Sequence, residues 1–316
     1  MGDENQLVSI VIPVFNRAKF IEETIQSALN QSYPYVEVVV SDNSSTDGTW
    51  ELLQKISSEN ENVRIYRNES NIGPVRNWIK AVSLADGYYT KILWSDDQMD
   101  PEFVSSALEM MAEDVGFCMS AVAVMNLERP GYEVIKYSER FGKIHSESYI
   151  HGQLLESEFS FSPGNALFRT ADLLSSLQAD IPNSVESDFS QHAIGNDLLL
   201  LLKVACMYKY VANIQRPLNF FLEHPGSISL AAKGGKVPLH YLLTKSYFVE
   251  RYRPDYCSRL AALIKIELLR RPDAKKYNMR NLGDFFSKKV SVDYIFLFSI
   301  LYKKITSFSM RKINVA

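Results

Sequence analysis

The sequence is poor in features that mark several common protein classes. Its three cysteines, Cys118, Cys206 and Cys257, lie far apart and match no zinc-binding or redox spacing, so we expect reduced, mostly core residues in an intracellular protein. No apolar run approaches the roughly 20 residues of a membrane span. The longest late run, YIFLFSILY at residues 294–302, is less than half that length. The start, MGDENQ, is polar and acidic and predicts no signal peptide, so we expect a cytoplasmic protein.

Glycine-rich phosphate-binding motifs are absent as well. The chain has no Walker loop, and no G-x-G-x-x-G follows the apolar run LVSIVIPV at residues 7–14. This argues against a P-loop enzyme and against an ordinary dinucleotide-binding protein. A ligand that carries phosphates would therefore have to be held by a metal ion and basic side chains.

The net charge of −3 conceals an uneven distribution. Residues 233–316 contain 18 Lys and Arg against 6 Asp and Glu, whereas residues 1–232 contain 16 against 31. An acidic body with a basic tail indicates different partners for the two parts. No recognised nucleic-acid-binding module accompanies the basic residues, so we expect no nucleic-acid partner.

What the chain does have is a regular alternation of strand and helix patterns. Apolar, β-branched runs predict strands buried on both faces, and helical patterns lie between them; the runs cover residues 7–14, 36–41, 63–66 and 88–94. Such alternation predicts the α/β class, with a Rossmann-like, mostly parallel central sheet flanked by helices. We expect Asn16 to cap the first helix and Pro74 to begin a later one.

The pattern loosens after residue 113. We expect a loop leading into an edge strand at residues 160–169, a buried helix at 194–207, two short strands in YKYVAN and PLNFFL, and mostly helix from 237 onward. The simplest partition is a catalytic domain at 1–232, with halves at 1–113 and 114–232, followed by a basic helical C-terminal extension at 233–316.

Polar segments follow three of the predicted strands: residues 15–17, 41–47 and 95–97. In a parallel sheet these segments meet at one edge, where ligands of such folds bind. Asp96 and Asp97 stand side by side there, and adjacent carboxylates are suited to a hard divalent cation such as Mg²⁺ or Mn²⁺. The alternative for any one segment is a solvated turn.

Several motifs in order resemble the family 2 glycosyltransferases, which have the GT-A fold. IPVFN, SDNSSTDGT, NIGPVRN and SDD match that family's strand ends, and the resemblance extends over roughly residues 7–230. It implies an inverting enzyme that moves a sugar from a nucleotide diphosphate donor, expected to be UDP-linked, to a hydroxyl of a glycan or lipid-linked oligosaccharide in bacterial polysaccharide synthesis.

The same resemblance implies roles on the donor side. Asp42 matches the acid that accepts from the uracil imide, and Asp97 matches the metal ligand, with Asp96 its neighbour near the ribose. Ser95 stands where a full D-x-D has its first acid, which leaves the metal as either Mn²⁺ or Mg²⁺. The remaining donor-side positions are Pro13, Phe15 and Arg17 beside the nucleoside and Arg76 on the nucleotide.

Further roles follow for the acceptor side. Asp197 in GNDLLLLL matches the family's catalytic base, with Asn196 in place of the usual Glu; the alternative is a residue that only caps the helix. Gly164 would allow close approach of a substrate, and Asn165 would bond a sugar hydroxyl. His224 matches a histidine that approaches the metal or the diphosphate, the alternative being an ordinary surface or core histidine.

The basic tail mixes aromatic residues with lysines, as helices that lie on anionic membranes do. We therefore expect the chain at the inner face of the cell membrane; the alternative is a docked helix whose lysines face water. Two further functions stay open at this point: a metal-dependent nucleotidyltransferase and a non-catalytic module that binds a nucleotide sugar.

Overall fold

The computed structural model describes residues 6–126, 129–135, 138–224 and 235–302. By contacts between Cα atoms the chain forms two compact units. Unit 1 comprises residues 1–180 and 188–231, and unit 2 comprises residues 181–187 and 232–316. The predicted boundary at residue 232 stays a prediction. The segment 181–187, which belongs to unit 2, interrupts the sequence of unit 1.

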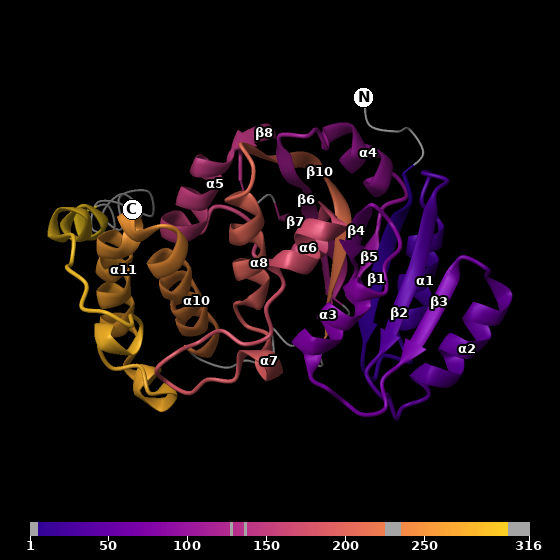
Figure 1. Cartoon of the computed structure of the whole chain (residues 1–316), viewed down its shortest axis with the longest axis horizontal. Coiled ribbons are helices and arrows are strands. Elements are labelled where there is room, and N and C mark those ends of the chain that lie inside the picture. The colour runs from indigo at the N-terminus through magenta and orange to yellow at the C-terminus, as the bar shows by residue number, and fades with distance from the viewer. Residues whose placement is uncertain (1–5, 127–128, 136–137, 225–234, 303–316) are drawn as a thin grey trace. The chain divides into compact units, whose positions relative to one another are not determined.

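The N-terminal part of unit 1 is a parallel, four-stranded arrangement in the order β3-β2-β1-β4 (Figure 1). The continuous β-branched runs of β1 and β2 form its centre because both faces of these strands are buried. Helices alternate with the strands; the elements are β1 (Val8–Val14), α1 (Ile21–Leu29), β2 (Val36–Asp42), α2 (Thr49–Glu59), β3 (Val63–Arg67), α3 (Pro74–Ser83) and β4 (Tyr89–Ile92).

The C-terminal part of unit 1 extends this sheet. β9 pairs antiparallel with both β4 and β6, and β10 runs parallel to β6. The elements are β5 (Gln98–Met99), α4 (Phe103–Met110), β6 (Val115–Asn126), β7 (Arg129–Ile135), β8 (Gly142–His145), α5 (Ser146–His151), η1 (Gly152–Glu156), η2 (Pro163–Asn165), β9 (Ala166–Arg169), α6 (Thr170–Ser176), α7 (Phe189–His192), α8 (Asn196–Ala205) and β10 (Tyr210–Glu223).

The predicted α/β class with a central sheet and flanking helices is confirmed, and three local expectations need correction. β9 is an interior strand, not an edge strand, because β4 and β6 flank it. YKYVAN and PLNFFL belong to one long strand, β10, which is irregular between Ile214 and Asn219. Asn16 caps no helix: α1 begins at Ile21, and Asn16 has φ 52°.

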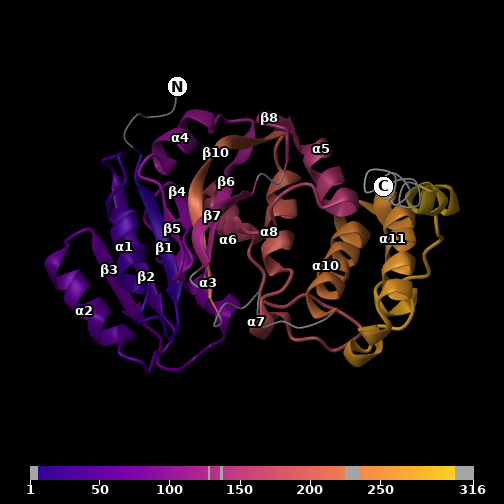
Figure 2. The ribbon, with the colours of Figure 1, turned by 180° about the vertical axis from the view of Figure 1, so that it is seen from behind.

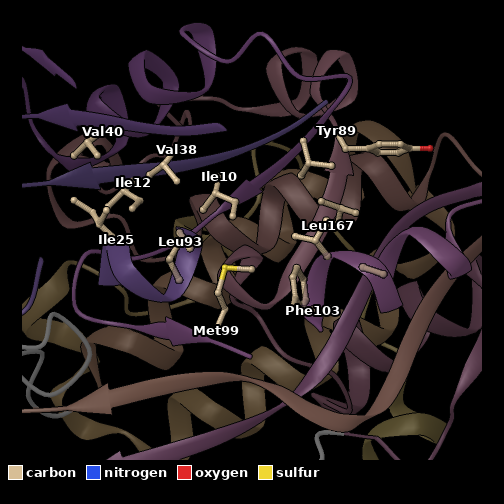
Figure 3. Packing of buried hydrophobic residues seen from close by; sticks show 14 of the residues in the cluster. Ile10, Ile12, Ile25, Val38, Val40, Tyr89, Leu93, Met99, Phe103 and Leu167 are labelled. Carbon is tan, nitrogen blue, oxygen red and sulfur yellow. The ribbon is translucent and has the colours of Figure 1, made fainter. Parts of the chain in front are cut away.

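A large apolar core lies on one face of the sheet. Ile10 and Ile12 of β1 and Val38 and Val40 of β2 pack with Ile25 and other residues of α1, α2 and α4 (Figure 3). α3 covers the opposite face, where Ser41 Oγ donates to Asn77 Oδ1 at 2.8 Å. Because side chains alternate along each strand, every strand provides contacts to the helices on both faces of the sheet. Figure 2 shows the same strands from behind.

Unit 2 is helical in the part that the structure describes. It contains α10 (Lys236–Tyr252), α11 (Cys257–Arg270), the short turns η3 (Pro254–Tyr256), η4 (Pro272–Tyr277) and η5 (Leu282–Asp284), and helical residues 294–302. Buried leucines and alanines of α10 and α11 pack these two helices together. No helix among the described residues is both long and apolar enough to span a membrane.

Candidate functional site

The three polar segments that follow β1, β2 and β4 meet at the carboxyl edge of the sheet. Val14 and Asp42, the last residues of β1 and β2, lie in register. Beyond them, the backbone N–H of Asn16 donates to Ser45 Oγ at 2.9 Å, and Asn16 Oδ1 accepts from the Thr46 N–H at 2.9 Å. Asn16 has a left-handed backbone conformation in this loop, which asparagine tolerates better than most residues. The tertiary structure thus makes one site from segments distant in sequence.

A charged cluster joins the ends of β1, β4 and β10. Arg17 Nε donates to Asp96 Oδ2 at 3.2 Å, and His224 Nε2 lies 2.9 Å from the same oxygen. The His224 ring also packs on Phe20, with ring centroids 4.6 Å apart. All three polar side chains are largely buried. Their interaction energy is therefore screened less by solvent than that of a surface pair.

Asp97 lies deeper than its neighbour. Its Oδ1 accepts from the backbone N–H of Leu222 at 2.9 Å. Burial raises the pKa of this carboxyl well above its usual range because the charged form loses hydration, and the negative charge of Asp96 raises it further. The Leu222 hydrogen bond and the Lys91 ammonium act in the opposite direction. A cation beside Asp97 would stabilise its ionised form.

Asp42 is fully buried at the end of β2. Its two carboxylate oxygens accept from the Ser45 N–H, each at 3.2 Å, and Arg67 Nε lies 3.3 Å from Oδ2. The Arg67 side chain is 38% exposed, and its guanidinium stands 5.2 Å from the Trp50 ring. Asp42 is therefore at the predicted edge, with Arg67 and the Ser45 turn covering its carboxylate.

The other donor-side positions differ in accessibility. Phe15 is 40% exposed, whereas Pro13 and Ser95 are buried. Arg76 projects from α3 and donates to Ser190 Oγ at 2.6 Å and to Asp180 at 3.2–3.3 Å. The structure thus brings Arg17, Asp96, Asp97 and His224 together, and it engages Arg76 with protein partners.

A network of amides that was not predicted supports this edge. Asn43 Nδ2 donates to Asn71 Oδ1 at 2.9 Å, and Asn43 Oδ1 accepts from Asn68 Nδ2 at 3.1 Å and from the Ile72 N–H at 2.9 Å. Asn68 also donates to Asn77 Oδ1 at 2.9 Å. The concentration of asparagines around NIGPVRN was the available signal. These residues fix the loops after β2 and β3 in position.

The acceptor-side positions Gly164 and Asn165 lie in η2. Asn165 is buried, and its Nδ2 donates to the backbone carbonyl of Ser120 at 2.7 Å. A Cβ on Gly164 would stand 2.7 Å from Trp94 Cδ1, so the absence of a side chain here is explained by the indole of Trp94. Gly164 lies against the indole of Trp94, and the close approach of a substrate stays a prediction.

Asp197 is the second residue of α8. Its Oδ1 accepts from the Gly195 N–H at 3.0 Å and from the Leu198 N–H at 2.8 Å. The amide of Asn196, in contrast, points to the carbonyls of Gln178 and Ala179. α8 packs against η2, and η2 packs against β4. These hydrogen bonds keep the carboxylate at the positive end of the helix dipole, and whether Asp197 acts as a base or only stabilises the helix start stays a prediction.

Within the described ranges no group of three or more His, Cys, Asp and Glu side chains is arranged to hold a metal ion. The donor set that is present consists of the two adjacent carboxylates and the His224 imidazole. Carboxylate oxygens suit Mg²⁺ and Mn²⁺, and imidazole suits transition metals. Asp97, with its ionised form held unfavourable by burial, is the side chain on which a cation would have the largest effect.

Solved structures share this fold. The Staphylococcus aureus protein TarS, solved as residues 1–349 with UDP-GlcNAc, superposes with a TM-score of 0.60 at 20% identity, covering 81% of this chain and 70% of that one. The mannosyltransferase PcManGT from Pyrobaculum calidifontis, solved with GDP-Man and Mn²⁺, gives a TM-score of 0.53 at 19% identity, covering 86% and 74%. The predicted GT-A fold is confirmed by these neighbours.

Sequence relatives lead to the family. The abequosyltransferase RfbV of Salmonella typhimurium is 42% identical over 96 residues, which are 29% of this chain and 29% of RfbV. The first curated relatives align over less than half of their own length. The model of Glycosyl transferase family 2 matches residues 9–174, more than half of the chain. This chain therefore belongs to Glycosyl transferase family 2.

Proposed function

We propose that the protein transfers a sugar, with inversion, from a nucleotide diphosphate donor to a hydroxyl of a glycan or lipid-linked oligosaccharide. UDP-sugars are the proposed donors. The observation that carries this proposal is the cluster of Arg17, Asp96 and His224 beside the buried Asp97 at the carboxyl edge of the sheet. It offers a cation and a carboxylate pair where a diphosphate and its counter-ion would lie.

A divalent metal is proposed here with the phosphates of the donor completing its ligands, because the described side chains alone form no metal site. Asp97 and His224 would hold it, with Asp96 alongside, and the raised pKa of Asp97 supports the choice because a cation relieves the cost of a buried carboxylate. The ion would neutralise the charge of the leaving diphosphate. Mn²⁺ is the ion bound in the mannosyltransferase that shares the fold, and Mn²⁺ and Mg²⁺ are both proposed here.

The nucleotide would bind along the ends of β1 and β2. Phe15 offers an exposed ring, and Arg17 lies between it and the acids. Asp42 is the proposed partner of the uracil imide. Because Arg67 covers Asp42 and is partly exposed, donor binding would displace the Arg67 side chain. Arg76 would contact the nucleotide only after leaving Asp180 and Ser190.

Asp197 is the proposed general base. Transfer requires a group that takes the proton of the acceptor hydroxyl as the bond to the sugar forms. Backbone N–H donors from Gly195 and Leu198 and the helix dipole stabilise the carboxylate of Asp197, the form that a base needs. Oδ1 receives both donors. Gly164 and Asn165 in the neighbouring η2 stay the proposed acceptor-side positions; both are buried here, so a substrate would reach them only if Trp94 or the Ser120 contact gave way.

The proposed membrane contact has a defined surface in unit 2. Helical residues 294–302 expose Tyr294, Ile295, Phe298, Leu301 and Tyr302; Ile295 is 87% and Phe298 64% exposed. At 100° per residue these positions form one stripe about 120° wide. Exposed Lys288 and Lys289 precede it. We name this stripe the apolar face and propose an anionic bilayer as its partner.

A donor panel tests the activity. The purified protein is incubated with UDP- and GDP-linked sugars and Mn²⁺, and release of the nucleoside diphosphate is followed with and without oligosaccharide acceptors. Acceptor-dependent release is expected with at least one donor. Release of pyrophosphate from a nucleoside triphosphate would instead identify a nucleotidyltransferase. Tight donor binding without any turnover would identify a binding module.

A further inference from the structure

Two residues in and just beyond β4 form hydrogen bonds with the acceptor-side loop, residues 160–165. Lys91, inside β4, donates from Nζ to the carbonyl of Gly164. Trp94, two residues beyond the end of β4, donates from Nε1 to Ser162 Oγ at 3.1 Å. Ser162 Oγ also accepts from the Gly164 N–H at 3.1 Å. Both polar groups of the Gly164 backbone are therefore engaged, directly or through Ser162, by β4 and its extension.

The indole of Trp94 is itself fixed. Its ring lies 4.7 Å from that of Trp78 in α3, tilted by 47°. Trp78 belongs to a small apolar cluster with Val75 and Ala193, and Ala193 is four residues before Asp197. Trp94 thus contacts the loop with one part of its ring and Trp78 of this cluster with another. Gly164 fits against the indole only because it lacks a Cβ.

A lysine at position 91 is unfavourable for the folding free energy because its amine is buried. It is fully buried, with Nζ 4.9 Å from the centre of the Phe103 ring and a second hydrogen bond to the Ile92 carbonyl at 3.1 Å. Burial lowers the pKa of the amine to about 7, while the charge of Asp97 favours the protonated form. An apolar residue would fill this space at less cost in folding free energy. Stability alone therefore does not account for an amine here.

We propose that Lys91 and Trp94 are positioning residues that hold the acceptor-side loop, residues 160–165, against the strand end that carries Asp96 and Asp97. The structure places both residues on the same short stretch as the acids, only two to six positions away. The acceptor role of the loop rests on the proposed function, but the contacts that hold the loop can be tested without turnover.

Hydrogen exchange tests the geometry alone. The backbone amides of residues 160–162, 164 and 165 (residue 163 is a proline) are compared in the wild type, Lys91→Met, Trp94→Phe and Ser162→Ala, with no ligand present. Each variant should exchange these amides at least about tenfold faster, as loss of a roughly 1.5 kcal/mol hydrogen bond would allow. The amides of β1 should be unchanged, and Lys55→Met, which alters an exposed lysine of α2, serves as the control. Unaltered exchange at 160–165 in all three variants would overturn the proposal.

Kinetics then separate positioning from donor binding. In Trp94→Phe and Ser162→Ala, which leave the charge beside Asp97 unchanged, the acceptor KM should rise about tenfold, by the same hydrogen-bond loss, while donor affinity stays within about twofold of wild type. Acceptor-independent hydrolysis of the donor should continue. An equal loss of donor affinity would show that these residues serve the donor site and would contradict the proposal. A wild-type protein without turnover would defeat the proposed function, and the exchange experiment would still decide the positioning role.

Discussion

His224 Nε2 lies 2.9 Å from Asp96 Oδ2 although 128 residues separate the two in sequence. The contact joins the end of β10 to the segment between β4 and β5, and Arg17 Nε approaches the same oxygen. Asp96 therefore receives two donors from different parts of unit 1. The contact makes His224 part of the charged cluster, and because the side chain is buried it is not a surface histidine; its role at the metal or the diphosphate stays a prediction.

Replacing His224 should weaken donor binding in the presence of metal. His224→Ala removes a hydrogen bond to a charged group, an interaction of about 1.5–3 kcal/mol, so roughly 10- to 100-fold lower affinity for the donor is expected. Calorimetric titration with a UDP-sugar and Mn²⁺ measures it. His145→Ala is the matched control, because His145 also packs on a ring, that of Tyr210, at the opposite end of β10. Equal affinities for both variants would remove His224 from the site.

Asp197→Asn should abolish transfer and preserve donor binding. Loss of a positioned base lowers rates by roughly 100- to 10,000-fold, whereas the amide oxygen of asparagine still accepts from the N–H groups of Gly195 and Leu198. Initial rates and donor titrations measure the two effects. Asp172→Asn, in the first turn of α6, is the control for an acid at a helix start. Transfer at the wild-type rate would exclude Asp197 as the base.

Asn43→Asp should destabilise unit 1. The amide of Asn43 donates to Asn71 Oδ1 and to the Gly73 carbonyl, and a carboxylate would face the Gly73 oxygen with no proton to share. Buried unpaired polar groups cost about 1–3 kcal/mol, so a lower free energy of unfolding by that amount is expected. Urea denaturation followed by tryptophan fluorescence reports it, since Trp50, Trp78 and Trp94 all lie in unit 1. Asn62→Asp, at an exposed position, should have little effect.

Lys91 should make stability depend on pH in the alkaline range. Its pKa is about 7 in the folded protein against an ordinary 10.5, so between these values the unfolded chain binds a proton that the folded chain does not. Stability conferred through this group therefore rises with pH, by up to about 1.4 kcal/mol per pH unit. Below pH 7 both states are protonated and the dependence ends.

Comparing the wild type with Lys91→Met checks that stability rises with pH. Urea unfolding at pH 7, 8, 9 and 9.5 should show wild type gaining stability relative to Lys91→Met as the pH rises. Lys55→Met should track the wild type throughout, because Lys55 is exposed. A difference between wild type and Lys91→Met that stays constant over this range would show that the Lys91 pKa is not lowered by burial.

The apolar face of residues 294–302 should govern binding to anionic vesicles. The double substitution Ile295→Ser with Phe298→Ser removes two of its well-exposed side chains, and each loses roughly 1.5–3 kcal/mol of burial in the interface. Flotation with phosphatidylglycerol vesicles should fall at least about tenfold. Tyr132→Ser with Val134→Ser, two exposed apolar residues of β7, should float like the wild type. Equal flotation of both double variants would exclude the apolar face as the contact.

Local pattern alone determined a large part of this protein. Continuous β-branched runs predicted β1 and β2 because strands covered on both faces need apolar residues at every position. Pro74 marked the start of α3, since proline lacks the N–H that a first turn leaves unpaired. The order and spacing of the strand-end motifs led to the family, and the match of the family model confirmed it.

The tertiary structure decided which side chains meet. The sequence ALFR fits an edge strand or an interior one, and only the order of the sheet places β9 between β4 and β6. A lysine in a short strand normally indicates a solvated face, yet Lys91 is buried because Gly164 and Phe103 close over it. The periodicity of apolar residues predicts which face of its own helix or strand each residue occupies. Contacts such as His224 with Asp96 depend on how elements distant in sequence pack, because packing, and not local propensity, sets those distances.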